Sequence, residues 1–315
     1  MKKLPRRLSE VIRRKQLYLD EIRGTLQSSA LKLQGELFSR LVENIIPRLD
    51  VKDGVLQETA KNYQLISELD NLYDAFSDKI IQKIFPQIYK GVIGISDISE
   101  EYFALSLRTL PESFEKIIKG TRELINLKLG IRTDKLIEGG NLKSALRIKP
   151  DALKQLLSRA VASQMNMKEF ISAIRDNVIG SEKTGVIDRQ FQQFAYDTYQ
   201  QYDAAYNKKL ADEFDMKYFI YQGGLVVDSR DFCVCHEGNV YTTKESEEWR
   251  VWTPANGTYP EGYEIKQKDI YARPSYMKYD GYDPLIDRGG YNCRHIIAYI
   301  SEDYAFKLRP ELKKK

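Results

Sequence analysis

The chain has 315 residues, of which 42% are hydrophobic and 30% are charged, and its net charge is only +4. This length and composition are ordinary for a soluble protein with two domains and a sizeable core. No apolar run approaches the roughly 20 residues that a membrane span requires. The basic start lacks the apolar segment of a secretory signal, and three cysteines are too few for a secreted disulfide framework. We therefore expect the chain to act in the cytoplasm in which it is made.

Basic residues gather at both ends of the chain, within residues 2–15 and 313–315. One interpretation is that these are solvated, frayed termini. The other is that they are basic arms that contact nucleic acid or an acidic partner.

Residues 1–215 have the pattern of amphipathic helices. Within 33–46, apolar side chains recur every fourth position and form one stripe, which ends near Pro47. A second stripe, with spacings of three and four, runs over 65–80, and Pro86 is expected to interrupt the pattern that follows. Further helices are predicted at 98–128, 150–162, 166–178 and 186–214.

Two of these predicted helices carry additional signals. Asn166 followed by Glu169 indicates a capping box at the start of 166–178. The helix at 186–214 places several aromatic residues, including Phe191 and Tyr202, on one face. That face is either a packing surface or a stacking surface for nucleic-acid bases, although stacking surfaces are more often built on sheets.

The character of the sequence changes at about residue 216. The segment "KYFIYQGGLVVD" alternates like a strand, and "GNVYTTKE" predicts a turn, a short strand and a helix start capped by Thr242 with Glu245. Residues 253–290 have loop composition, and "CRHIIAYIS" predicts a final buried strand. We therefore predict a mainly α protein with an extended helical N-terminal region, residues 1–215, and a small C-terminal α+β module, residues 216–315.

Cysteine and histidine cluster in two short segments, "DSRDFCVCHEG" and "GGYNCRH". Cys233 and His236 form a C-x-x-H pair, and Cys293 and His295 form a C-x-H pair. Two chelating pairs separated by a long insertion are typical of structural zinc sites, in which two turns close around a tetrahedral ion. Cys235 is an alternative ligand for the first pair, and an extended "CVC" segment would place it on the same side as Cys233.

Three other interpretations of the two segments remain open. The cysteines can form a reduced, partly buried cluster, or Cys293 can form a disulfide with Cys233 or Cys235, which a cytoplasm disfavours. The first segment can also be catalytic, with carboxylates beside a histidine base or a cysteine nucleophile. Asp228 and Arg230 have a simpler role at the end of a predicted strand, where the aspartate caps a turn and the arginine binds a carboxylate.

The order of these features resembles the phage Mu F-like head morphogenesis (minor head) proteins, in particular the type found in phages and prophages of Bacteroidetes-type hosts. The C-terminal module of that family typically reads D-x-R-x-C-x-x-C and, after a glycine turn, H-P-N-C-R-C. Asp228, Arg230 and Cys233 match the first block, and His236 stands where its second cysteine would be.

The last block of the family is matched by Asn292, Cys293 and Arg294, with His295 in place of the final cysteine. The family's His-Pro is replaced by Gly-Tyr at 290–291. A metal site would therefore use the permuted set Cys233, His236, Cys293 and His295, with Cys235 as the alternative. The turn residues of the module would be Asp228, Arg230, Asn292 and Arg294. The resemblance covers roughly residues 186–300.

The resemblance implies a virion component rather than an enzyme, present in few copies at the capsid interior or portal vertex after assembly in the host cytoplasm. Its partners would be the portal protein, the major capsid or scaffold protein and packaged DNA, with no membrane in the assembled head. Its role would be to aid head assembly and genome packaging or ejection. Two alternatives are a metal-dependent nuclease or toxin-like effector, which would use Asp228, Asp231, Glu237 and His236, and a nucleic-acid-binding adaptor.

Overall fold

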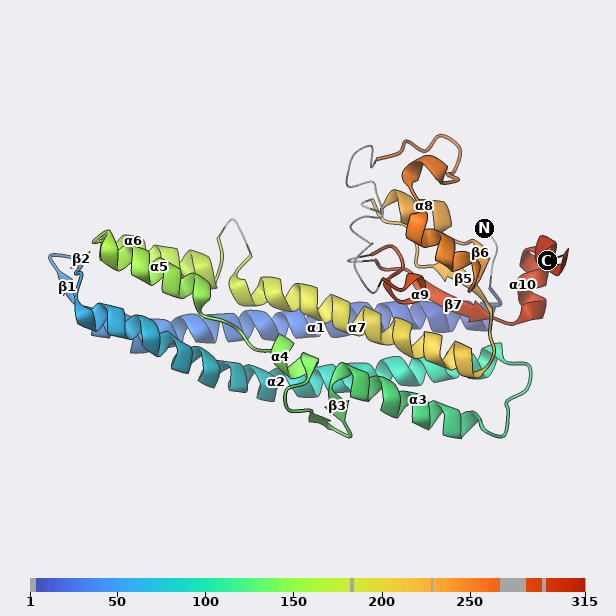
Figure 1. The fold of residues 1–315 in the computed structure, drawn as a ribbon, viewed down its shortest axis with the longest axis horizontal. Helices are drawn as coiled ribbons and strands as arrows, with labels where there is room; N and C mark the ends of the chain where they lie inside the picture. Colours follow the sequence, from blue (N-terminus) through green and yellow to red (C-terminus); the bar gives the residue numbers. More distant parts are fainter. Residues whose placement is uncertain (1–3, 182–183, 228, 267–281, 291–292, 315) are drawn as a thin grey trace. The chain divides into compact units, whose positions relative to one another are not determined.

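The computed structural model describes residues 4–181, 184–227, 229–266, 282–290 and 293–314 (Figure 1). The predicted fold class is confirmed: long helices occupy the first two thirds, and a small α+β module follows. The N-terminal helices are α1 Arg6–Asn44, α2 Ala60–Ser106, α3 Phe114–Leu129, α4 Asn141–Ala145, α5 Asp151–Ala162, α6 Met167–Val178 and α7 Val186–Glu213. Among the described residues, no helix combines the length and apolar character that crossing a bilayer requires.

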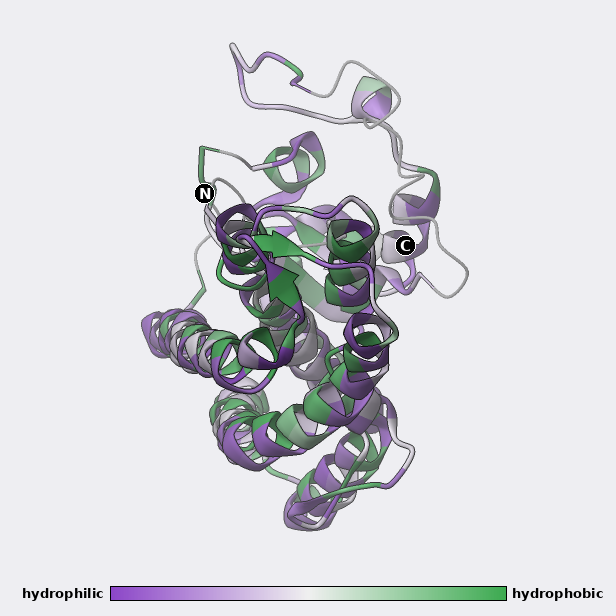
Figure 2. Ribbon diagram, turned by 90° about the vertical axis from the view of Figure 1, so that its left-hand side faces the viewer, coloured by the Kyte–Doolittle hydropathy of each residue, from purple (hydrophilic) through white to green (hydrophobic). Residues whose placement is uncertain are grey.

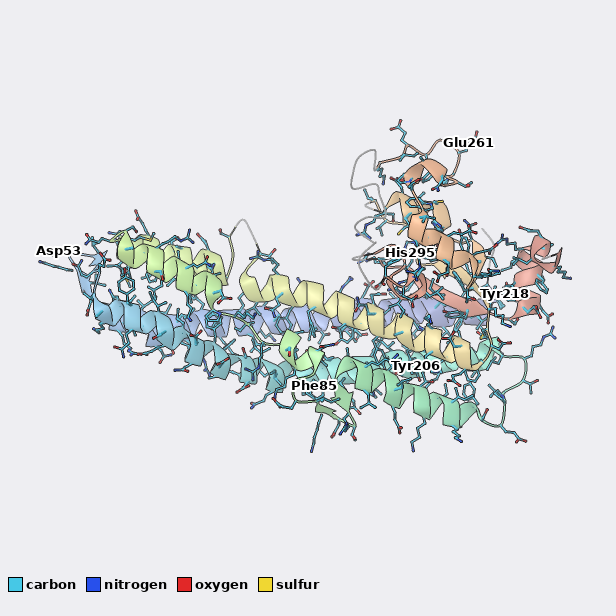
Figure 3. All side chains as sticks on the ribbon, in the orientation of Figure 1. Asp53, Phe85, Tyr206, Tyr218, Glu261 and His295 are labelled. Atoms are coloured by element: carbon cyan, nitrogen blue, oxygen red, sulfur yellow. The ribbon has the colours of Figure 1, made fainter. Side chains whose placement is uncertain are left out.

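Two short antiparallel hairpins interrupt the helices, and neither was predicted. They pair β1 Val51–Lys52 with β2 Val55–Leu56, and β3 Ile131–Arg132 with β4 Lys135–Leu136. Asp53, at the tip of the first hairpin (Figure 3), has a positive φ of 53° and is followed by Gly54 at 76°. Aspartate and glycine tolerate this left-handed backbone, which explains why the turn forms at this point.

Helix boundaries agree with the predictions at 150–162, 166–178 and 186–214, each within one residue. Asn166 caps α6, since its side chain accepts a hydrogen bond from the backbone N–H of Lys168 at 2.9 Å. The prediction of one helix over 98–128 was wrong, because α2 ends at Ser106 and α3 begins at Phe114. Pro111 lies between them and cannot continue a helix from the preceding turn.

Pro86 does not interrupt the helical pattern, contrary to the prediction, and lies inside α2. A proline in a helix interior costs about 3 kcal/mol through a lost hydrogen bond and a clash. Ile84 and Ile88 flank it and are fully buried. Burial of such side chains contributes about 1.5–3 kcal/mol each, which is enough to offset the cost.

The basic residues near the N-terminus are not a frayed end over the part that the structure describes. Leu8, Val11 and Ile12 are buried on one face of α1, whereas the arginines at 6, 7, 13 and 14 are exposed. Near the C-terminus, Pro310–Lys314 form a short 3-10 helix. Residues 1–3 and 315 lie outside the described residues.

The chain divides into two compact units, and the division runs through α1, α2 and α7. Unit 1 comprises residues 1–21, 91–128 and 196–315, and unit 2 comprises residues 22–90 and 129–195. The predicted boundary between residues 215 and 216 is therefore not the boundary between compact units, although the change from helix to strand does occur there. The small module packs in the same unit as the ends of three long helices.

Unit 2 is a helical core. The stripe that was read from the sequence is buried, with Leu33, Leu37 and Leu41 at most 1% exposed, and hydrophobic and hydrophilic residues alternate along the turns of the long helices (Figure 2). Gln34 links α1 to the start of α7, because its amide donates to the carbonyl of Ile179 at 2.8 Å and accepts from the N–H of Asp188 at 3.0 Å.

In unit 1, a buried polar network joins the helices. The ammonium of Lys15 on α1 lies 2.8 Å from Asp203 on α7 and 2.7 Å from the hydroxyl oxygen of Ser99 on α2. Tyr202 and Tyr206, the latter marked in Figure 3, stack with ring centroids 5.8 Å apart. Tyr202 is 3% exposed and Tyr206 is fully buried, so these aromatic residues of α7 pack inside the unit, as the packing interpretation predicted.

The C-terminal module of unit 1 is built on a three-stranded antiparallel sheet of order β6-β5-β7. The strands are β5 Tyr218–Gln222, β6 Val240–Thr242 and β7 Ile296–Ile300. The helical elements around them are α8 Asp231–His236, η2 Glu245–Val251, η3 Pro254–Asn256, α9 Pro284–Asp287 and α10 Glu302–Leu308. The predicted strand at 293–301 is confirmed over Ile296–Ile300, whereas the strand predicted at 217–228 forms only in its first half, because β5 ends at Gln222 before Gly223.

One hydrogen bond ties this module to the helices of unit 1, and a reciprocal pair of bonds fixes a turn within the module. Tyr102 at the end of α2 donates its hydroxyl to the carbonyl of Tyr299 on β7 at 2.8 Å. The predicted capping box of Thr242 and Glu245 forms, because each side chain accepts the other residue's backbone N–H, at 3.0 and 2.9 Å. The antiparallel pairing of Gln222 with Ile296 places the end of β5 beside the start of β7.

Candidate metal centre

Three of the predicted ligands meet where β5 ends and β7 begins. Cys233 lies on α8, and Cys293 and His295 lie in the segment that leads into β7. The pairing of Gln222 with Ile296 sets the register. Gly223 follows directly, and a Cβ atom there would lie 2.6 Å from the Cα atom of His295. Only glycine allows the two strands to approach so closely at this end of the sheet.

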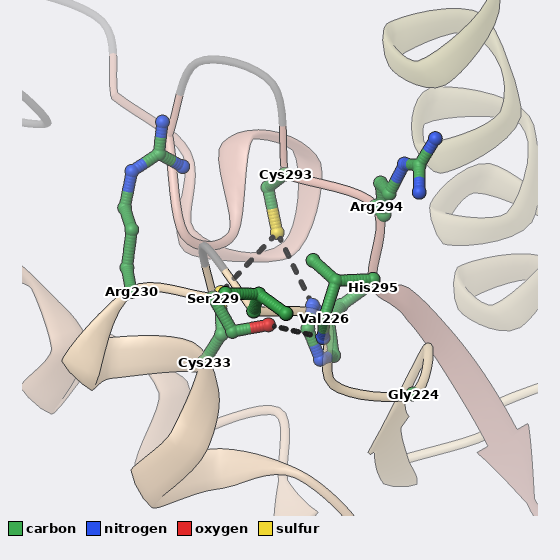
Figure 4. A pocket seen from close by; sticks show the side chains of 9 residues that line it. Gly224, Val226, Ser229, Arg230, Cys233, Cys293, Arg294 and His295 are labelled. Atoms are coloured by element: carbon green, nitrogen blue, oxygen red, sulfur yellow. Dashed lines mark hydrogen bonds between the residues drawn. The ribbon is translucent and has the colours of Figure 1, made fainter.

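The three ligand atoms have the spacing of a metal site (Figure 4). The Sγ atoms of Cys233 and Cys293 are 3.9 Å apart, and Cys293 Sγ is 3.8 Å from His295 Nδ1. All three atoms lie within 4.8 Å of one another, and all three residues are buried. A tetrahedral zinc ion with ordinary bond lengths would hold two sulfurs about 3.8 Å apart and a sulfur and a nitrogen about 3.6 Å apart. This group could therefore hold a metal ion with little rearrangement.

His295 is oriented from its other side by a carboxylate. Glu237 Oε2 lies 2.9 Å from His295 Nε2, and both side chains are less than a tenth exposed. A histidine that binds metal through one nitrogen commonly gives its other N–H to a carboxylate, which fixes the tautomer and raises the basicity of the ligand. In His295, Nδ1 faces the sulfurs and Nε2 contacts the carboxylate of Glu237, which is the same arrangement.

Tyr221 on β5 packs against the same group. Its ring stacks on that of His295 with centroids 4.7 Å apart, and its hydroxyl oxygen lies 3.1 Å from Cys293 Sγ and 3.6 Å from Cys233 Sγ. The hydroxyl can donate to a sulfur, and such a bond is stronger when the sulfur is a thiolate.

Gly289 covers the two sulfurs. A Cβ atom at this position would lie 2.9 Å from Cys233 Sγ, 3.1 Å from Cys293 Sγ and 3.2 Å from the Tyr221 hydroxyl. The backbone of the α9–β7 segment is thus pressed against the cysteine pair, and no larger residue fits without displacing it.

The charges around the pair favour one thiolate and one imidazolium. Burial acts to raise the pKa of Cys293, but hydrogen bonds with Cys233 and His295, together with the charges of His295 and the buried Arg288, lower it well below its usual range. Burial acts to lower the pKa of His295, but hydrogen bonds to Cys293 and Glu237 raise it to about 9. The pKa of Cys233 is raised well above its usual range. The largest cause is its hydrogen bond to Cys293, and the next is burial.

His236, the predicted fourth ligand, is placed outside this group. Its Nδ1 lies 2.7 Å from the carbonyl oxygen of Phe232 and donates to it, and the two rings stack with centroids 4.0 Å apart. Trp249 and Trp252 pack edge-on against the same imidazole. Burial lowers the pKa of His236 to about 4, so at neutral pH it is an uncharged core residue.

Cys235 also faces away from the other two cysteines. The "CVC" segment is helical rather than extended, so Cys233 and Cys235 do not share a face. The sulfur of Cys235 accepts the backbone N–H of Thr258 at 3.2 Å. All three cysteines are free and buried, but only Cys233 and Cys293 lie together, and Cys233 is on a helix rather than on a strand.

The predicted turn residues have mixed outcomes. Arg230, the residue before α8, donates to the carbonyl of Gly289 at 3.1 Å and so connects the two segments that hold the cysteines. Arg294 lies between the ligands Cys293 and His295, and its guanidinium is 3.7 Å from Asp20 on α1. Asp228 and Asn292 lie outside the described residues.

The carboxylates of the nuclease alternative do not form a common site in the described part of the chain. Asp231 is fully buried and accepts hydrogen bonds from the Tyr263 hydroxyl at 2.7 Å and the Lys266 backbone N–H at 3.1 Å. Glu237 contacts His295, and His236 is enclosed by aromatic rings. Asp231 therefore anchors a loop to the start of α8.

The sequence offered no signal for Tyr221 or Gly289, because each reaches the site through the register of distant segments. Glu237 is next to His236 in the sequence, but in the structure its carboxylate contacts His295. No family model, no curated protein and no solved structure matches it significantly. The resemblance to the Mu F-like proteins therefore depends on the motif residues themselves.

Proposed function

We propose that this chain is a phage structural protein of the Mu F-like minor head type, and that Zn²⁺ bound in its C-terminal module stabilises that module. One observation carries the proposal: the two short blocks that bear the resemblance share one buried site. Cys233 comes from the first block, and Cys293 and His295 come from the second, at distances suited to a metal ion. A site made from both blocks gives a physical reason for their occurrence in one chain.

Zinc fits the donor set best. Two thiolates and an imidazole are ligands that select zinc over harder cations such as Mg²⁺ and Ca²⁺. The neighbouring carboxylate of Glu237 completes the arrangement in which a histidine ligand is held from its second nitrogen. A bound ion would link α8 to the segment before β7 and so close the module.

The matched control for zinc binding is Cys235, which lies on the same helix as Cys233 but faces Thr258. We expect purified wild-type protein, expressed with sufficient zinc, to contain about one zinc per chain, given the tight binding of structural sites. Cys233→Ser and Cys293→Ser should lose the ion, and Cys235→Ser should keep it. Less than about 0.2 zinc per wild-type chain would count against the ligand set.

The proposed place of action is the capsid interior or the portal vertex, after assembly in the host cytoplasm, with portal, major capsid or scaffold protein as partners. The exposed arginines of α1 at residues 6, 7 and 13 suit contact with packaged DNA, because they can neutralise phosphates and release counterions. The test is co-sedimentation of the purified chain with procapsids or portal rings, with an unrelated protein of similar mass as the control. A chain that stays at the top of the gradient contradicts the virion assignment but leaves the zinc assignment standing.

A further inference from the structure

Another cavity lies in the C-terminal module, and its described lining does not include Cys233, Cys293 or His295. Its volume is about 710 Å³, which is in the range of small-molecule sites. Its walls come from the end of α8, from β6, from η2 and the segment after η2, and from Arg309, which follows α10. The described lining residues all fall within 235–258 or at 309, where the structure has no gap.

Aromatic rings form one part of the wall. Trp249 and Trp252 meet the imidazole of His236 at interplanar angles of 76° and 64°, and Trp249 meets the ring of Tyr241 at 86°. The two indoles are only 2% and 8% exposed, so core packing holds these rings in place. Rings at such steep angles border a space from several sides, and aromatic rings attract cations through the negative charge of their faces.

The ionised groups of the lining have a net negative charge. Arg309 is engaged within the protein, because its Nη1 and Nη2 atoms lie 2.7 and 2.9 Å from the two carboxylate oxygens of Glu245. Glu248 is exposed and lines the same cavity. Among the described residues, the neighbouring Glu247 pairs with Arg250, whereas Glu248 forms no ion pair. Glu245 and Arg309 cancel, which leaves the carboxylate of Glu248.

The other titratable groups of the lining do not change this balance. Burial lowers the pKa of His236 to about 4 and raises the pKa of both Cys235 and Tyr241, so all three are uncharged at neutral pH. The cavity therefore combines aromatic rings with one carboxylate that the described lining does not neutralise.

We propose that this cavity binds a small organic cation, whose ammonium group lies among the aromatic rings and near Glu248. The apolar part of such a ligand has a surface to cover, because Val251 lines the same cavity and is 65% exposed. The carboxylate would repel an anion, and a hard metal ion needs more oxygen ligands than Glu248 supplies. The site uses none of the proposed zinc ligands, so it adds a binding activity to the proposed function.

Tryptophan fluorescence reports directly on this cavity, because the chain has two tryptophans and both line it. The full chain is titrated with choline and with tetraethylammonium at constant ionic strength. Each cation should change the emission in a saturable way. The neutral alcohol 3,3-dimethylbutan-1-ol has the shape of choline without its charge. It should bind at least about tenfold more weakly, because the attraction between the cation and the rings is lost.

Glu248→Gln should weaken choline binding roughly fivefold, which is the effect of one carboxylate a few ångströms from an ammonium in water. Glu247→Gln is the matched control. Glu247 is also exposed and precedes Glu248, but it pairs with Arg250 and is not among the described residues that line the cavity. Its substitution should leave the affinity for choline unchanged.

The proposal is overturned if neither cation changes the emission in a saturable way. Equal affinity for choline and its neutral counterpart would make the cavity an apolar site and would also overturn the assignment of a cation. Equal losses in Glu248→Gln and Glu247→Gln would assign the effect to general surface charge, and an unchanged affinity in Glu248→Gln would remove the carboxylate from the site. Zinc content and co-sedimentation are measured separately, so none of these results depends on the proposed function.

Discussion

Replacing Gly289 with alanine would test whether the cysteine pair is held in the geometry of a metal site. The added Cβ would lie 2.9 Å from Cys233 Sγ and 3.1 Å from Cys293 Sγ. Ordinary contacts of this kind need about 3.5–4 Å. The sulfurs or the backbone must therefore move by about 0.6 Å, whereas metal–ligand distances tolerate only about 0.2 Å. We expect zinc affinity to fall at least tenfold, about 1.4 kcal/mol.

The same substitution should also destabilise the metal-free protein by about 1–3 kcal/mol, the usual cost of overpacking a core. Zinc affinity is measured by competition with a chromophoric chelator, and stability by urea unfolding with and without zinc. Because a ligand at about 100 times its Kd adds about 2.7 kcal/mol of stability, a weakened site appears as a smaller difference between the two urea curves.

Gly120→Ala is the matched control for this experiment. Gly120 lies inside α3, and a Cβ there would meet no atom within 4 Å. Alanine is favoured over glycine in a helix by about 0.5–1 kcal/mol, so this variant should be slightly more stable and should bind zinc normally. The reasoning is refuted if Gly289→Ala binds zinc as tightly as wild type and unfolds at the same urea concentration.

Three further predictions concern other parts of the same unit. Glu237→Gln should weaken zinc binding about 10–100-fold by releasing the second nitrogen of His295, measured by the same chelator competition; equal affinity would show that the carboxylate does not orient the ligand. The stability of the metal-free protein should fall by up to about 3 kcal/mol as pH drops from about 6.5 to 4, because burial lowers the pKa of His236 to about 4 and its protonation favours the unfolded chain. Urea unfolding curves across this pH range should show a smaller fall in the His236→Phe variant. An equal fall in the variant and the wild type would contradict the role assigned to His236. Lys15→Met should cost about 3–5 kcal/mol by leaving Asp203 buried without its cation, whereas Lys79→Met, at a partly exposed pair, should change unfolding by less than about 1 kcal/mol.

The helices could be predicted where apolar residues recur along one face. The stripe of Leu33, Leu37 and Leu41 and the caps at Asn166 and Thr242 act within a few residues, so their effects are visible in the sequence. Pro86 misled the prediction because its local cost is offset by burial in a tertiary core, which the sequence does not display. The two hairpins were missed since strands of two residues give no periodic signal.

The sequence indicated which residue types would form the candidate site. It did not indicate which of the cysteines and histidines would come together. Cysteine and histidine at short spacing indicated Cys233, Cys293 and His295. The same spacing also indicated His236, and residues at i and i+3 do share a helix face. The aromatic rings that enclose the imidazole of His236 come from several elements: from α8 itself, from β5 and β6, and from η2 and the residue after it. That competition between packing and coordination is decided by tertiary contacts.

The geometry also discriminates between a metal ion and a disulfide at the cysteine pair. A Cys233–Cys293 disulfide would need only the two sulfurs, now 3.9 Å apart. It would leave no role for His295 Nδ1 at 3.8 Å from Cys293, nor for the buried contact between Glu237 and the other imidazole nitrogen. A metal ion uses every one of these groups, and its charge balances the thiolates that would otherwise be costly to bury. The buried histidine–carboxylate pair beside the cysteines is therefore the feature that favours a metal centre over an oxidised cysteine pair.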